Sequence, residues 1–63
     1  MDIKRSLQVR IAYGLENASA AGWHKISFEQ AMPKAKEICE AVNYKSLAAA
    51  KRYMVANRIE CIV

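Results

Sequence analysis

The chain has 63 residues, of which 54% are apolar and 25% charged, and it contains only two glycines and one proline. This composition excludes a disordered chain, which is poor in apolar residues, and a collagen-like or linker chain, which is rich in glycine and proline. No run of about 18 uncharged apolar residues occurs, so the sequence predicts no membrane span. We expect residues 1–63 to form a single small helical domain.

A chain of this length buries only about 60% of its unfolded surface and needs a further source of stability. Cys39 and Cys61 could form one disulfide at most, and the chain begins without the apolar stretch of a secretion signal. We therefore expect reduced thiols and a cytoplasmic location. A closed zinc site takes four ligands, which two cysteines and the lone His24 do not supply. No metal or other cofactor is expected. Close packing and self-association therefore remain as the possible sources of additional stability.

The first predicted element is a helix over 2–21, with Asp2 as its N-cap and Gly22 after its end. Within it, Gly14 costs about 1 kcal/mol relative to alanine, and Ala18 lies four residues further on. We interpret this small-residue pair as a notch for another helix, although Gly14 could also be merely tolerated or break the helix. Apolar residues recur along one face: Ile3, Leu7, Ile11, Leu15 and Ala18.

The second predicted element is a helix over 28–42, which follows a connector anchored by Trp23. Ser27 and Gln30 have the spacing of a capping box, in which each side chain binds the other residue's backbone N–H. Pro33 either kinks this helix or, after a short turn, begins a new one. The apolar register continues past the proline, which favours one kinked helix.

The third predicted element is a helix over 46–57, with Ser46 as its N-cap and a tight turn before it. The tail over 58–63 has alternating apolar residues at Ile59, Cys61 and Val63, which indicates a short strand. A packed helical extension or an arm that grips a partner subunit fits the tail equally well. The predicted fold class is thus all-α with three helices and an apolar tail.

The sequence contains no sign of catalysis. It lacks a glycine-rich phosphate loop and the HExxH, CxxC and GxSxG motifs. Glu37 and Glu40 share a helix face but are interpreted as solvated charges, and His24 as a structural or exposed connector residue. We predict that the protein is not an enzyme.

The basic residues are unevenly distributed. The net charge is +4, and four of the ten basic residues lie between Val42 and Ile59, where no acidic residue occurs; the remaining six are balanced by six acidic residues. Two helices joined by a short turn resemble a helix-turn-helix, with 46–57 as the recognition helix. Its opening residues, however, include few groups that read base edges. The candidate phosphate-binding residues are Lys45, Lys51, Arg52 and Arg58.

Two resemblances follow from these residues. The element order is similar to a truncated winged helix, and Phe28-Glu29-Gln30-Ala31, Arg52-Tyr53 and Arg58-Ile59 resemble excisionase-type proteins. The turn lacks the usual glycine, and no second wing strand follows. Over the full chain, the size, basic charge and lack of catalytic motifs resemble the small early-region accessory proteins of lambdoid bacteriophages. That resemblance implies a protein that binds host factors and modulates the host or phage development.

We expect a non-catalytic regulator or adaptor that acts through protein contacts, with DNA binding as the alternative. Its partners would be a second copy of itself and an unidentified host or phage protein, with no membrane involved. A symmetric dimer would supply the interior that a short chain lacks, although a compact monomer could use the same residues internally. The expected dimer interface consists of Leu7, Ile11, Gly14, Leu15, Ala18, Ile59, Ile62 and Val63.

Overall fold

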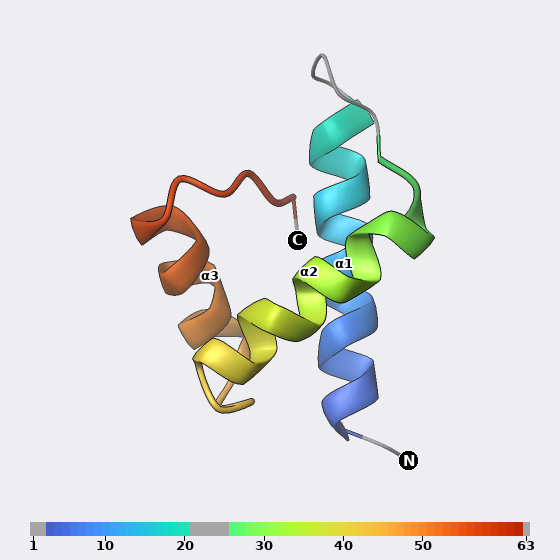
Figure 1. Ribbon diagram of the computed structural model, residues 1–63. Coiled ribbons are helices and arrows are strands. Elements are labelled where there is room, and N and C mark those ends of the chain that lie inside the picture. Colours follow the sequence, from blue (N-terminus) through green and yellow to red (C-terminus); the bar gives the residue numbers. More distant parts are fainter. Residues whose placement is uncertain (1–2, 21–25, 63) are drawn as a thin grey trace.

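The computed structural model describes residues 3–20 and 26–62, and the described residues form three helices and no strand. The helices are α1 (Ile3–Ala20), α2 (Phe28–Ala41) and α3 (Leu47–Ala56). α2 crosses α1, and α3 lies beside the far end of α2 (Figure 1). The expected all-α fold with three helices is confirmed, and each helix boundary lies within one residue of its prediction.

The start of α2 forms as the sequence predicts. The Oγ of Ser27 accepts a hydrogen bond from the backbone N–H of Gln30 at 3.2 Å. The side chain of Gln30 accepts one from the backbone N–H of Ser27 at 2.9 Å, which completes the capping box. Pro33 lies inside α2, so the helix is continuous and does not begin at the proline.

The turn between α2 and α3 contains two residues with left-handed backbone conformation, Asn43 (φ 54°) and Tyr44 (φ 53°). Asparagine tolerates this region, whereas a tyrosine there stores strain of about 1 kcal/mol or more. Three contacts hold Tyr44 in place. Its N–H donates to the carbonyl of Cys39 at 2.8 Å, its hydroxyl accepts from Nε2 of Gln8 at 2.7 Å, and the Nζ of Lys4 lies 5.3 Å from its ring centre. The turn is thereby tied to α1.

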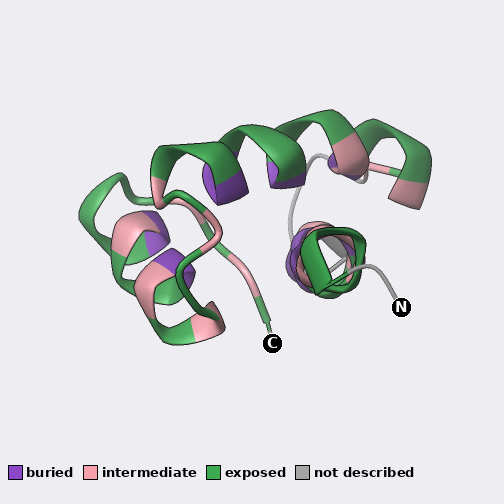
Figure 2. Ribbon diagram, turned by 90° about the horizontal axis from the view of Figure 1, so that it is seen from below, coloured by how far each residue is buried: buried purple, intermediate pink, exposed green. Residues whose placement is uncertain are grey.

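The core lies where the three helices face one another, as the buried positions in Figure 2 show. Of the nine buried residues that the described part of the chain contributes to this core, four are alanines, whose small side chains let the helix backbones approach closely. Ile11, Ile38 and Met54 provide one large buried side chain from each helix. Among residues 3–20 and 26–62, the core cluster consists of Ile11, Ala12, Leu15, Ala31, Ala35, Ile38, Cys39, Ala50 and Met54.

Residues 59–62 form no strand, so the strand interpretation of the tail was wrong for the part that the structure describes. After Arg58, which has a φ of 57°, residues 59–62 return from the end of α3 to α1 without regular structure (Figure 1). The exposure of the side chains does alternate along the tail. Ile59 and Cys61 are half-buried, and the residues after each are exposed. A strand needs a neighbouring strand for its hydrogen bonds. This tail packs against helices instead.

The notch at Gly14 is occupied by this tail. The N–H of Ile62 donates to the carbonyl of Gly14 at 2.9 Å, and the Sγ of Cys61 lies 3.7 Å from the carbonyl oxygen of Ile11. A carbonyl oxygen has two lone pairs, so it can accept this bond inside a helix. Because glycine has no Cβ, the backbone of the tail reaches the backbone of α1. The close approach expected at Gly14 is therefore made by the chain's own tail.

Candidate nucleic-acid interface

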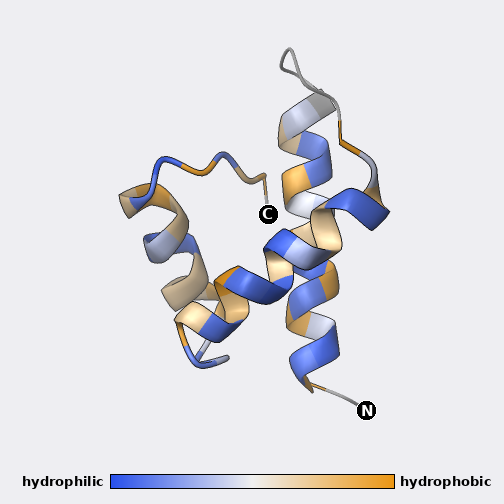
Figure 3. Ribbon diagram, viewed as in Figure 1, coloured by the Kyte–Doolittle hydropathy of each residue, from blue (hydrophilic) through white to orange (hydrophobic). Residues whose placement is uncertain are grey.

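The outward face of α3 carries two of the four expected cations. Ala50 and Met54 turn inward, and Arg52 is exposed on the opposite side of the helix, with Lys51 exposed on its flank. Figure 3 shows the hydrophilic part of α3 in its middle, between less polar first and last turns. The face also presents Val55, whose side chain is 77% exposed.

The other two cations, Lys45 and Arg58, lie next to the two capped ends of α3. Lys45 precedes the N-cap Ser46, whose Oγ accepts from the N–H of Ala49 at 3.1 Å. Arg58 follows the C-cap Asn57, whose side-chain amide donates to the carbonyl of Tyr53 at 2.8 Å. Both are exposed. The helix between them, Leu47–Ala56, is about 15 Å long at helical rise.

The charge of this face is not neutralised locally. Within residues 3–20 and 26–62, none of the four cations makes an ion pair, and the ion pair present joins Lys34 to Glu37 at 3.9 Å on the exposed side of α2. An exposed pair of that kind contributes about 0–1 kcal/mol. We call Lys45, Lys51, Arg52 and Arg58 the cationic face.

Most residues expected at a dimer interface lie inside the single chain. Ile11, Gly14, Leu15 and Ala18 are buried, while Leu7 and Ile59 are half-buried. Ile62 is 58% exposed. Val63 lies outside the described residues, as do the expected N-cap Asp2, the anchor Trp23, the connector residue His24 and Gly22. The buried members already make contacts within the chain, and the dimer interface itself stays a prediction.

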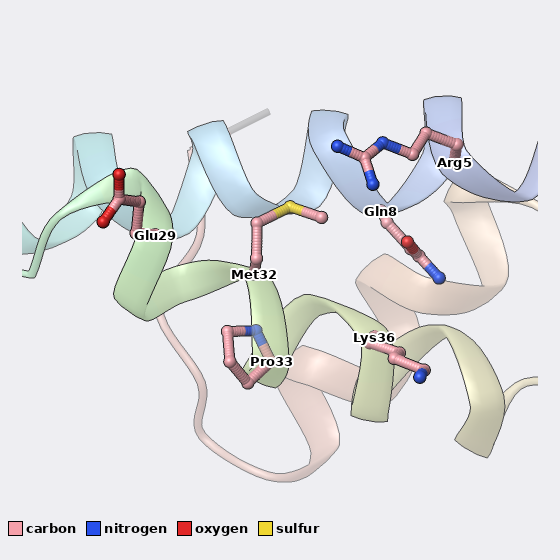
Figure 4. Close-up of a pocket in the computed structure, with 6 residues that line it drawn as sticks. All are labelled: Arg5, Gln8, Glu29, Met32, Pro33 and Lys36. Atoms are coloured by element: carbon pink, nitrogen blue, oxygen red, sulfur yellow. The ribbon is translucent and has the colours of Figure 1, made fainter.

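Sequence reasoning did not find the groove between α1 and α2, which has a volume of about 520 Å³ (Figure 4). No motif marks its residues, since the groove arises from the way the two helices cross. Near this crossing, the rings of Tyr13 and Phe28 pack with centres 4.6 Å apart. The groove is lined by Arg5, Gln8, Glu29, Met32, Pro33 and Lys36.

The two cysteines are free thiols. Burial, together with the nearby carboxylate of Glu40, raises the pKa of Cys39, so its nucleophilic thiolate form is disfavoured. Burial also raises the pKa of Cys61, although Lys51 acts in the opposite direction. Among the described residues, no cluster of three or more histidine, cysteine or acidic residues could hold a metal ion. No helix in the described ranges has the length and apolar character needed to cross a membrane.

The fold and the interface define a small all-α protein with a cationic third helix on its surface. No protein-family model matches the chain, and comparison with curated proteins and with solved structures finds no significant match.

Proposed function

We propose that the chain is a non-catalytic regulator that binds nucleic acid through the cationic face. The observation that carries the proposal is the exposure of four cations on α3 and its two ends, within a stretch that holds no acidic residue. Nucleic-acid phosphates bind such surfaces because each neutralised phosphate releases counterions. In this arrangement α2 and α3 form the helix-turn-helix pair, and α1 packs against α2.

The side chains of α3 favour binding with little base specificity. Arg52 can form the bidentate contact with guanine that reads the major groove, and Val55 can contact a thymine methyl group. Ala48 and Ala56 are exposed and carry no polar group. Their small size lets the helix approach the phosphates closely. Affinity should therefore depend more on salt than on sequence.

The test measures the affinity for a short labelled DNA duplex by fluorescence anisotropy across a salt series. Four phosphate contacts predict a log–log slope of about −3.6. Lys51→Glu with Arg52→Glu should weaken binding at least about tenfold and reduce the magnitude of the slope by about 1.8, because two contacts are lost.

The matched control is Lys34→Glu with Lys36→Glu on α2. Both residues are exposed, and the pair changes the net charge by the same amount. If the cationic face binds DNA, the control weakens binding much less than the α3 variant. Equal loss from the two variants, or no binding at low salt, would contradict the proposal.

Action through protein contacts is the second candidate function, and the α1–α2 groove favours it. The homodimer and the resemblance to phage early-region proteins stay predictions. Light scattering tests the dimer: a particle of twice 7.1 kDa would support it, and a particle of 7.1 kDa would contradict it.

A further inference from the structure

The α1–α2 groove has a different chemical character from the cationic face, and the two share no residue. Arg5 and Gln8 line it from α1, while Met32, Pro33 and Lys36 line it from α2 (Figure 4). In the same view, Arg5 and Lys36 lie toward one end of the groove, and Glu29 lies at the other.

The groove combines an apolar surface with charges separated along its length. Met32 is half-buried and lies with Pro33 between the two charged ends (Figure 4). Gln8 is held in the wall by its hydrogen bond to the hydroxyl of Tyr44 at 2.7 Å. An occupant that fits would carry a negative group toward Arg5 and Lys36 and an apolar group against the centre.

Pro33 adds a hydrogen-bond acceptor. A helical carbonyl points along the axis toward the residue four positions on, and the carbonyl of Glu29 therefore points toward Pro33. Proline has no N–H, so this carbonyl lacks its usual helical donor. Both residues line the groove. A backbone N–H from a bound peptide would supply that donor.

We propose that the groove binds an acidic peptide segment of a partner protein. An aspartate or glutamate carboxylate lies near Arg5 and Lys36, and a neighbouring apolar side chain packs on Met32 and Pro33. A peptide N–H binds the carbonyl of Glu29. Nucleic acid is disfavoured, because the surface of Met32 and Pro33 between the charged ends matches an apolar side chain rather than a continuous charged backbone. A small ligand is disfavoured too, since an open groove buries too little of its surface.

The test uses an N-acetylated, C-amidated hexapeptide of alternating leucine and aspartate, titrated into isotope-labelled full-length protein and followed by amide chemical shifts. The amides of Gln8, Met32 and Lys36 should shift together. Lys36→Glu should weaken binding about five- to tenfold, because an attraction at an exposed site becomes a repulsion. Lys34→Glu is the matched control: it lies on the same helix, is exposed and does not line the groove. It should weaken binding less than about twofold.

Several outcomes would overturn the proposal. One is the absence of groove shifts at saturating peptide, and another is equal weakening by Lys36→Glu and Lys34→Glu. A control peptide has asparagine in place of each aspartate. If it binds as tightly as the leucine–aspartate peptide, the carboxylate has no role in binding. Equal binding of hexanoate would assign the groove to small anions. The Lys51→Glu and Arg52→Glu variant should keep its peptide affinity, so failure of this proposal is distinguishable from failure of nucleic-acid binding.

Discussion

Replacing Gly14 by alanine tests whether the tail docks on α1. Alanine in a helix interior is favoured over glycine by about 1 kcal/mol, so helix propensity alone predicts stabilisation. In this fold the added methyl group crowds the tail where the N–H of Ile62 reaches the Gly14 carbonyl at 2.9 Å. Losing that bond costs about 0.5–1.5 kcal/mol. Loosening the half-buried Ile59 and Cys61 costs about 1 kcal/mol more. The expected net result is destabilisation by about 1 kcal/mol.

A double-mutant cycle with Ile62→Pro isolates the hydrogen bond. Proline removes the N–H donor at an exposed position without emptying the core. In that background, Gly14→Ala should be about 1 kcal/mol more favourable than in the natural chain, because the bond is already absent. Urea unfolding followed by far-ultraviolet circular dichroism measures both effects, with about 1 M change in midpoint per kcal/mol. If Gly14→Ala stabilises both backgrounds equally by about 1 kcal/mol, the docking argument is refuted.

Three further predictions concern stability. Ile38→Ala empties a fully buried position and should cost about 2–5 kcal/mol, most of the stability of so small a domain; a thermal transition as high as that of the natural chain would contradict this. Ser27→Ala removes a capping box and should cost about 1 kcal/mol in urea unfolding, whereas Ser27→Asp should retain most of the stability. The folded pKa of Cys39 is raised above its ordinary value of 9.0, so its contribution to stability is complete below that value and is lost as the pH rises through and above it. Cys39→Ala should therefore flatten the alkaline fall of the unfolding free energy, and an unchanged slope would be the contrary result.

The helices were predictable because their boundaries depend on local signals. The capping box of Ser27 and Gln30 and the N-cap Ser46 involve residues three apart, which a sequence displays directly. The continuity of α2 through Pro33 followed from the apolar register on both sides of it. Hydrogen bonds between residues three apart and helical periodicity can be predicted without knowing the rest of the fold.

The tail shows where such signals end. Alternation at Ile59 and Cys61 correctly predicts which side chains of the tail are the less exposed ones. It does not predict whether the surface they pack on is a neighbouring strand or a helix. The candidate site likewise has a part that the sequence predicts and a part that it does not. The charge of the cationic face can be read from the sequence, whereas its exposure and the α1–α2 groove depend on how the helices cross.

The return of the tail to α1 has a consequence for the order of folding. The contact of Cys61 with Ile11 joins residues 50 positions apart in a chain of 63, whereas α1 and α2 are neighbours along the sequence. Closing a long loop costs entropy before its contacts can compensate, so helices α1 and α2 should pair first and the tail should dock last. Native-state hydrogen exchange should then show the amide of Ile62 opening while the α1–α2 pair stays protected.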